Sequence, residues 1–170
     1  MKRLGLIHYL VWTLLVSLSL PVRSDSICPA CSIGGVTLGM TPGQVLSMLG
    51  EPTERVGNEN WTVWEYAEGQ NVLAVHFHNF RNPALRPVYP SLLVDRNVGL
   101  QVSAVSGYSI DFGPGSSLTA NSAWDEIVAK LGTPTGEIEY PEAKLVYWEG
   151  FQAYLTHGRV KYYVFGGFSQ

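Results

Sequence analysis

The five-residue string Leu-Gly-x-Pro-Thr occurs twice in this chain of 170 residues, at 49–53 and again at 131–135. An amphipathic stretch precedes each copy. The glycine stands where it can cap a helix, and the proline two residues later cannot continue that helix. The string therefore predicts that a short helix ends at two equivalent points, and that the chain contains an internal repeat.

Helix start signals precede both strings. Thr41 to Gln44 form a capping box with proline at the first helical position. Ser122 precedes the second stretch, and Asp125 follows three residues later, where an acid suits the positive end of the helix dipole. The second stretch also carries one apolar face at helical spacing. Its members are Trp124, Ile127, Val128 and Leu131.

Segments rich in β-branched and aromatic residues follow each predicted helix. They lie at 61–66, 72–78 and 100–112 in the first half, and at 144–149, 152–157 and 159–165 in the second. We therefore predict an α+β fold of two tandem units, each with short helices packed on a small antiparallel β-sheet. Such small units bury little surface alone, so we expect them to share a core.

The N-terminus has the pattern of a secretory signal peptide, with a basic start, an apolar run and small residues at Val22 and Ser24. We expect an exported protein, periplasmic or secreted, that is cleaved near Ser24. A retained anchor helix is the alternative. The predicted divisions are the signal peptide 1–24, an N-terminal segment 25–35, a first repeat 36–108 with an inserted loop 80–99, a linker 109–117 and a second repeat 118–170.

Cleavage would remove three basic residues and leave eight basic against 14 acidic residues, a net charge of −6. An acidic protein without basic clusters is a poor match for nucleic acid, so we expect no nucleic-acid partner. No apolar stretch after residue 24 is long enough to cross a bilayer. Membrane contact is therefore expected only through an N-terminal anchor.

Two cysteines, Cys28 and Cys31, stand at the front of the mature chain. In an exported protein a disulfide is the simplest interpretation, and a lipid anchor on Cys28 is another. A thiol-redox pair needs its first cysteine at a helix N-terminus, and no helical pattern follows here. His76 and His78 share one face of a predicted strand and complete a Cys2His2 set on paper. A thiol-redox or metal-binding exported protein is thus the alternative function; we expect no metal and no cofactor.

Motifs that identify common enzyme classes are absent from the sequence. We find no nucleophile elbow, no phosphate-binding loop and no spacing that nominates a catalytic triad. We therefore expect a protein without catalytic activity.

The string Gly39-Met40-Thr41, followed by Leu49-Gly50-x-Pro52 and an aromatic strand, resembles the outer-membrane assembly lipoprotein family (SmpA/OmlA, the BamE type). The tandem form resembles the β-lactamase-inhibitor-protein type. The resemblance covers about 33–80 and 116–166, although the second copy lacks Gly-Met-Thr. It implies a helical hairpin on an antiparallel sheet, and a secreted or periplasmic binding protein without catalysis.

An aromatic sheet face and the loop 80–99 are the predicted binding elements, because Tyr, Trp and Arg are enriched at interface hot spots. Simple alternation along 159–165 places Lys161, Tyr163 and Phe165 on one face, and the alternative is that these aromatics are buried. The predicted partner is an envelope component or a secreted enzyme, and the protein an assembly scaffold or an inhibitor. The candidate contact residues are Arg86, Tyr89, Tyr154, Lys161, Tyr163 and Phe165.

Overall fold

The computed structural model describes residues 31–69, 71–82, 86–87, 95, 97–166 and 168–169. These residues form two helices, α2 (Pro42–Leu49) and α3 (Trp124–Leu131). The strands of the first half are β1 (Glu54–Gly57), β2 (Trp61–Glu68), β3 (Asn71–Asn79), β4 (Arg86–Pro87) and β5 (Leu100–Gly107). The later strands are β6 (Ser109–Asp111), β7 (Ser117–Thr119), β8 (Gly136–Glu139), β9 (Ala143–Trp148), β10 (Phe151–Thr156), β11 (Arg159–Gly166) and β12 (Phe168–Ser169).

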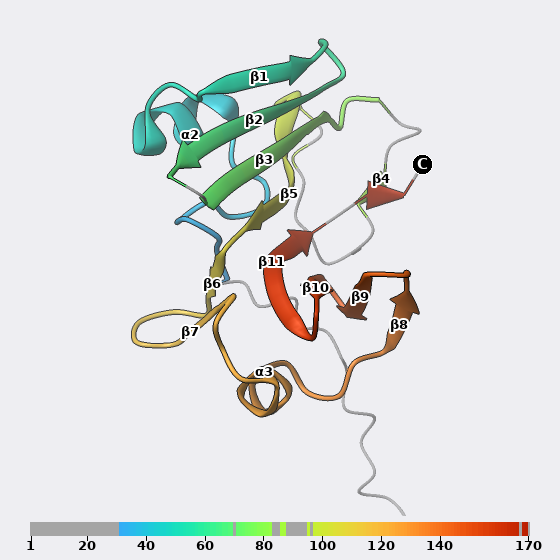
Figure 1. Cartoon of the computed structure of the whole chain (residues 1–170). Coiled ribbons are helices and arrows are strands. Elements are labelled where there is room, and N and C mark those ends of the chain that lie inside the picture. The colour runs from blue at the N-terminus through green and yellow to red at the C-terminus, as the bar shows by residue number, and fades with distance from the viewer. Residues whose placement is uncertain are drawn as a thin grey trace, which may run out of the picture.

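Eight strands form one antiparallel sheet in the order β1-β2-β3-β5-β11-β10-β9-β8 (Figure 1). β5 and β11 pair at its centre and join strands from the two halves of the chain. The predicted α+β fold of two tandem units, each with its own sheet, is therefore wrong. The described residues are mostly β, with one large sheet, two small two-stranded sheets and two short helices. Because β5 pairs with β11, the backbone N–H and carbonyl groups along these two strand edges are hydrogen-bonded, whereas two separate sheets would leave both edges open.

One row of side chains shows that the core is continuous across this sheet. Successive pairings connect residues of β2, β3, β5, β11, β10 and β9, and each of these side chains is at most 6% exposed. The row consists of Trp64, Val75, Val105, Phe165, Phe151 and Trp148. Val45 of α2 and Ile127 of α3 belong to the same core. Both helices therefore pack on one face, here called the inner face, and the opposite face is called the outer face.

The first helix begins and ends as the sequence predicts. The Thr41 hydroxyl accepts the Gln44 N–H at 3.3 Å, and the Gln44 side-chain oxygen accepts the Thr41 N–H at 2.8 Å. Gly50 closes the helix with a positive φ of 77° and donates its N–H to the Leu46 carbonyl. Gly50 has open space around it, so its conformation and not crowding favours glycine here.

The second helix differs at its start. Its N-cap is Ala123, which makes no side-chain capping bond, so the cap predicted at Ser122 is wrong. The Ser122 hydroxyl instead accepts the Thr119 N–H at 3.1 Å and closes the turn after β7. Gly132 ends the helix as predicted, with its N–H donated to the Val128 carbonyl at 2.8 Å. Among the residues described, neither helix has the length and apolar content that crossing a membrane requires.

The insertion 80–99 is described only in part. Arg81 donates to the Asn97 carbonyl at 2.7 Å, and the Asp95 N–H is donated to the Gln101 side chain at 3.0 Å. β4 pairs with β12 near the C-terminus, with Arg86 opposite Ser169 and Pro87 opposite Phe168. These contacts connect the described parts of the insertion to one another, to β5 and to β12.

Candidate interaction surface

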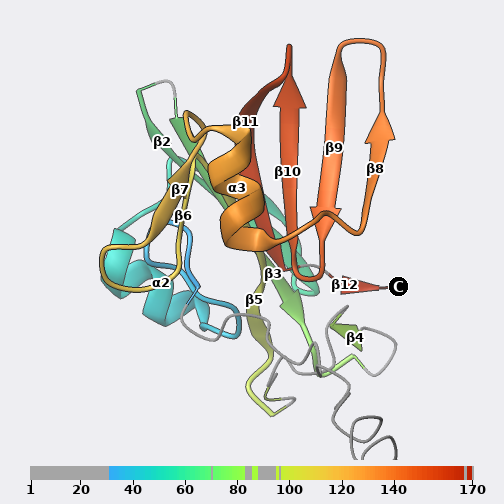
Figure 2. The ribbon, with the colours of Figure 1, turned by 90° about the horizontal axis from the view of Figure 1, so that it is seen from below.

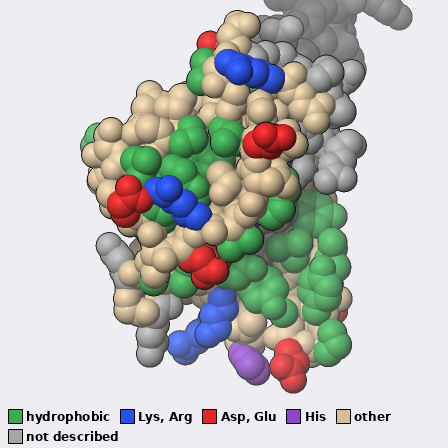
Figure 3. Space-filling model, turned by 90° about the horizontal axis from the view of Figure 1, so that it is seen from above, with side chains coloured by type: hydrophobic (Ala, Val, Ile, Leu, Met, Phe, Trp, Pro, Cys, Tyr) green, Lys and Arg blue, Asp and Glu red, His purple; other side chains and the backbone are tan. Residues whose placement is uncertain are grey.

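Four apolar side chains stand in register across the outer face of β8, β9, β10 and β11. Ile138 is opposite Leu145, Leu145 is opposite Tyr154, and Tyr154 is opposite Tyr162. Ile138 is 45% exposed and Tyr162 39% exposed, while Leu145 and Tyr154 are half-buried. We call these four residues the outer row. Figure 3 shows a band of hydrophobic side chains over the flank of the molecule to which β8 and β9 belong.

The two tyrosines of the outer row stack on one another. Their ring centroids are 5.0 Å apart and their planes are inclined by 13°. Burial raises the pKa of Tyr162, and the nearby Tyr154 adds to this effect. The phenol of Tyr162 therefore stays neutral at physiological pH, and its hydroxyl can donate as well as accept a hydrogen bond. Together the rings present a rigid aromatic surface with two polar tips.

The outer row ends at a hollow where β11 meets β5 and β3. This cavity has a volume of about 310 Å³, and it is lined by Asn71, Val72, Ser106, Tyr108, Lys161 and Tyr162. Lys161 is exposed beside the row, and Val72 is 49% exposed. Aromatic and aliphatic groups with a cation at the border have the composition of a protein-interface core and its rim.

A β-bulge decides which residues of β11 reach this surface. Tyr154 pairs with Tyr162 and Leu155 pairs with Val160, so Lys161 is an extra residue without an opposite. Such an insertion shifts the alternation of side chains by one position. Beyond the bulge, Tyr162 therefore faces outward and Tyr163 faces inward.

The bulge corrects the sequence prediction for two candidate contact residues. Tyr163 and Phe165 are 1% and 2% exposed, so the outward face predicted for them is wrong. The Tyr163 hydroxyl donates to the Thr119 carbonyl at 2.9 Å, and Phe165 stacks on Phe151 with centroids 4.9 Å apart. Neither side chain is available to a partner, and both stabilise the inner core.

Of the other four candidate contact residues, two lie at the outer row. Tyr154 lies in the outer row and Lys161 lies beside it. The backbone of Arg86 belongs to β4, which pairs with β12 in a separate two-stranded sheet, and Tyr89 lies outside the described residues. Sequence reasoning missed Ile138, Leu145 and Tyr162. The alternation of glutamate and isoleucine at 137–139 was a usable signal for a strand with one apolar face.

The cysteine and histidine pairs do not meet in the described part of the structure. Cys31 is 1% exposed in the inner core, whereas His76 pairs with Ala104 and Val63 on the outer face. Cys28 lies outside the described residues, so the predicted disulfide stays a prediction. His78 shares a 2.8 Å hydrogen bond with the Ser103 hydroxyl, and burial lowers the pKa of both histidines. No group of three or more His, Cys, Asp or Glu residues within the described ranges could hold a metal ion.

A second hollow lies on the inner face, beside α3. Its volume is about 560 Å³, and its lining is Trp124, Glu137, Pro141, Glu142, Ala143, Lys144, Val146, Leu155, His157 and Gly158. Figure 2 shows β8 and β9 extending to one side of α3, so that this helix does not cover that part of the inner face. The Trp148 indole N–H donates to the Gly132 carbonyl at 2.8 Å and fixes β9 against the end of the helix. We call this hollow the α3 groove.

The comparisons with known proteins assign no family. No protein-family model matches the chain, and no curated protein matches it. Among solved structures, the chain is similar to a DUF4309 family protein (YjgB) from Bacillus subtilis subsp. subtilis str. 168. The identity is 13%, the match covers 75% of this chain and 78% of that chain, and the TM-score is 0.41. This degree of likeness assigns neither fold nor function, and the resemblance to the SmpA/OmlA family stays a prediction.

Proposed function

We propose that this chain is an exported, non-catalytic protein-binding module whose partner docks on the outer row. The observation that supports the proposal is the register of four apolar side chains across four strands, two of them more than a third exposed. Isolated exposed apolar residues are ordinary on protein surfaces, but a contiguous row with a stacked aromatic pair has the character of an interaction site.

The shape of the surface favours a protein partner over a small molecule. Small-molecule sites are concave and enclose most of their ligand. The outer row instead crosses the face of a pleated sheet, and it offers a linear apolar contact with polar tips at Tyr154 and Tyr162. Tyrosine is a frequent hot-spot residue because it buries a large rigid ring while keeping a hydrogen-bonding group.

Two biological settings use such a surface, and both follow from the predicted export. An envelope assembly scaffold would hold another envelope component on the row. An inhibitor would place the row against a secreted or periplasmic enzyme. The identity of the partner distinguishes these settings, and the same residues serve in both.

In-cell photo-crosslinking tests the proposal because it captures a partner whose identity is unknown. A photoreactive phenylalanine analogue replaces Tyr162 in the full chain, and a matched variant carries it at Val56. Val56 is 49% exposed and lies on the outer face of β1, at the opposite edge of the sheet. We expect a discrete protein adduct from position 162, no such adduct from position 56, and loss of the adduct when Tyr154→Ala is added.

The contrary result is equally specific. Adducts of equal yield from both positions would show non-specific contact, and no adduct from position 162 would remove the outer row as the docking surface. Identification of the adduct by mass spectrometry then separates an envelope component from a secreted enzyme.

A further inference from the structure

β8 is one of the two edge strands of the eight-stranded sheet. It pairs with β9 along one edge, and within the described residues no strand pairs with its other edge. Glu137, Ile138 and Glu139 are all exposed. Open strand edges are templates for pairing with another chain. We propose that β8 accepts a basic, extended segment of the partner protein as a ninth strand. This inference rests on the proposed function and names the chemistry of the partner.

The hydrogen bonds of the β8–β9 hairpin show which groups of β8 are open. Tyr140 and Ala143 exchange both backbone hydrogen bonds, with N–H to carbonyl distances of 2.8 and 3.4 Å. Hydrogen-bonded and non-hydrogen-bonded pairs alternate in an antiparallel ladder. The neighbouring pair, Glu139 with Lys144, is therefore non-bonded, and the N–H and carbonyl of Glu139 point to the open edge. The same alternation turns the backbone groups of Glu137 to that edge.

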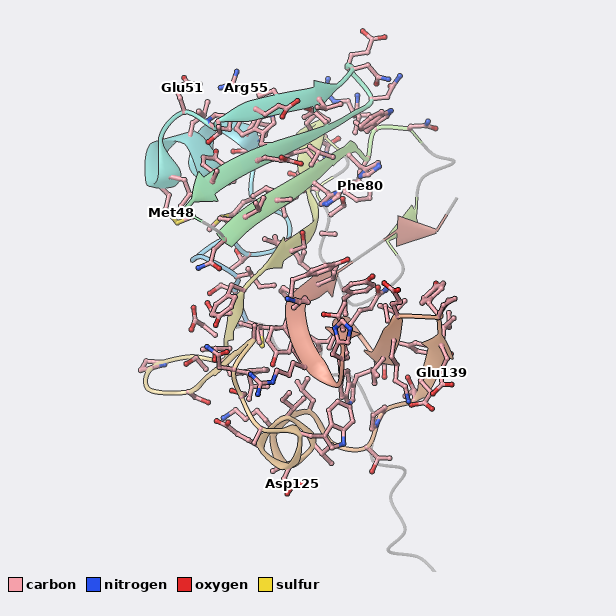
Figure 4. All side chains as sticks on the ribbon, in the orientation of Figure 1. Met48, Glu51, Arg55, Phe80, Asp125 and Glu139 are labelled. Atoms are coloured by element: carbon pink, nitrogen blue, oxygen red, sulfur yellow. The ribbon has the colours of Figure 1, made fainter. Side chains whose placement is uncertain are left out.

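The side chains of β8 specify the sequence that would fit there. Ile138 is the last member of the outer row, so an apolar residue on the added strand would extend that row. Glu137 and Glu139 project on the inner face, where Lys144 binds both carboxylates at 3.1 and 3.0 Å. Hydrogen bonds to Glu139 and Glu137 raise the pKa of Lys144, which stays charged. Figure 4 shows Glu139 at the outer margin of the sheet.

The local charge is unbalanced even after this ion pairing. Glu137, Glu139 and the exposed Glu142 supply three carboxylates against the single ammonium of Lys144. Glu137 and Glu142 also line the α3 groove, together with Trp124, which is 42% exposed. A lysine or arginine on the inner face of an added strand would lie beside these carboxylates and within reach of an indole face. The complementary segment therefore alternates basic and apolar residues.

A second copy of this chain does not fit the same edge. Pairing of β8 with the β8 of another copy would set glutamates against glutamates across the new ladder, which is destabilising. Pairing with the other sheet edge is also unfavourable, because the only cation of β1 is already engaged. Arg55 pairs with Glu51 and stacks on Trp64 at 4.5 Å, and Figure 4 shows Arg55 and Glu51 side by side.

Fluorescence anisotropy with defined peptides tests the inference on the full chain. The probe is a labelled peptide of alternating lysine and valine, about six residues long, which is a typical strand length. Its controls are the same peptide with glutamate for lysine, and the lysine peptide N-methylated at alternate residues. N-methylation keeps the charge but prevents strand pairing. We expect only the unmethylated lysine peptide to bind, and we expect its binding to protect the β8 amides from hydrogen exchange.

Two protein variants separate backbone pairing from charge. Glu139→Pro removes an edge-facing N–H and the carboxylate that Lys144 binds, but it breaks no backbone hydrogen bond to β9. We expect it to weaken peptide binding at least about tenfold, and more than Glu139→Gln does. Glu139→Gln keeps the backbone and removes one charge, so we expect weaker binding with a smaller salt dependence. Glu54→Gln in β1, at the opposite edge, is the matched control and should leave the affinity unchanged.

Binding of the N-methylated peptide with equal affinity would overturn the inference, because charge alone would then suffice. Equal affinity for Glu139→Pro, or no binding of the lysine peptide, would also overturn it. These results would leave the crosslink at position 162 unaffected. If that crosslink were lost while the peptide still bound, the outer row would be excluded as the docking surface, and β8 would remain the site of strand addition.

Discussion

The rings of Tyr154 and Tyr162 lie nearly parallel on the outer face, with centroids 5.0 Å apart and planes inclined by 13°. They stand on adjacent strands, at the last regular pair before the bulge. Two aromatic rings that stack on a partly exposed sheet face stabilise the sheet locally and leave one side of the pair to a partner. This arrangement separates the surface residues, which can be changed without unfolding, from the buried ones beneath them.

Tyr154→Ala should cost only about 0.5–1.5 kcal/mol of the free energy of unfolding, because it removes a half-exposed aromatic pair. Tyr163→Ala should cost about 3–5 kcal/mol, because it removes a fully buried ring and leaves a cavity. Urea unfolding monitored by tryptophan fluorescence measures both values. Similar losses for the two variants would mean that the outer row belongs to the core.

Two glycines of the first half should respond to alanine in opposite directions. A Cβ at Gly57, where φ is 138°, would lie 2.3 Å from the Trp61 carbonyl oxygen. Backbone strain and this clash should destabilise Gly57→Ala by about 1–3 kcal/mol. Gly43 lies in α2 with nothing within 4 Å, so Gly43→Ala should stabilise by up to about 1 kcal/mol. Thermal unfolding of the two variants checks the contrast, and a stabilised Gly57→Ala would contradict the turn geometry.

Alkaline unfolding should depend on Tyr163. Burial raises the pKa of this phenol from 10.0 to about 12, with Glu126 as a smaller cause. The folded state therefore retains a proton that the unfolded state releases. The resulting stabilisation is complete below pH 10.0 and is lost as the pH rises towards 12. In Tyr163→Phe the free energy of unfolding should fall less steeply with pH over this range, as measured by urea unfolding.

Two other phenols set the limit of that effect. The pKa values of Tyr66 and Tyr162 are also raised by burial, so some alkaline dependence should persist in Tyr163→Phe. At neutral pH the variant also loses the hydrogen bond to Thr119, which should cost about 0.5–1.5 kcal/mol. An unchanged alkaline slope would contradict the burial of Tyr163.

Acid should weaken the fold through His76 and His78. Burial lowers the pKa of both imidazoles below the ordinary value of 6.5, and the charge of Glu65 partly opposes this shift at His76. Just below pH 6.5 the unfolded state therefore binds more protons at these two imidazoles than the folded state does. The stabilisation is complete above pH 6.5 and is lost as the pH falls through the lowered pKa values.

The paired variant His76→Gln/His78→Gln should show a shallower loss of stability as the pH falls below 6.5. Differential scanning calorimetry at several pH values measures it. His157→Gln is the control, because His157 is an exposed residue of the turn between β10 and β11. If His157→Gln showed as shallow a dependence of stability on pH as the paired variant, the assignment of the acid effect to His76 and His78 would be contradicted.

Local signals in the sequence predicted the elements well where they act within one segment. The capping box at Thr41 and the glycine after each helix set the helix bounds, and alternation located β2, β3, β9, β10 and β11. β1 and β8 were missed because each has four residues and is exposed, with few β-forming side chains. Periodicity describes one strand at a time, so it could not show that β5 pairs with β11 and merges the two halves.

The outer row illustrates the same limit at the level of single residues. Alternation along 159–165 placed Tyr163 on the same face as Lys161, and the one extra residue at Lys161 separates the two. A bulge depends on the register of two strands, and the sequence of β11 alone carries no mark of it. Tyr154 keeps the face that simple alternation gives it, because β10 has no insertion of its own.

Isothermal titration of the crosslinked partner, once identified, tests the central claim most directly. Its affinity is measured for the wild-type chain, for Tyr154→Ala/Tyr162→Ala and for Trp61→Ala. Trp61 is 40% exposed on the same outer face but lies in β2, far along the sheet. The account predicts at least about tenfold weaker binding for the tyrosine variant and unchanged binding for Trp61→Ala. Equal affinities for the tyrosine variant and the wild type would contradict it.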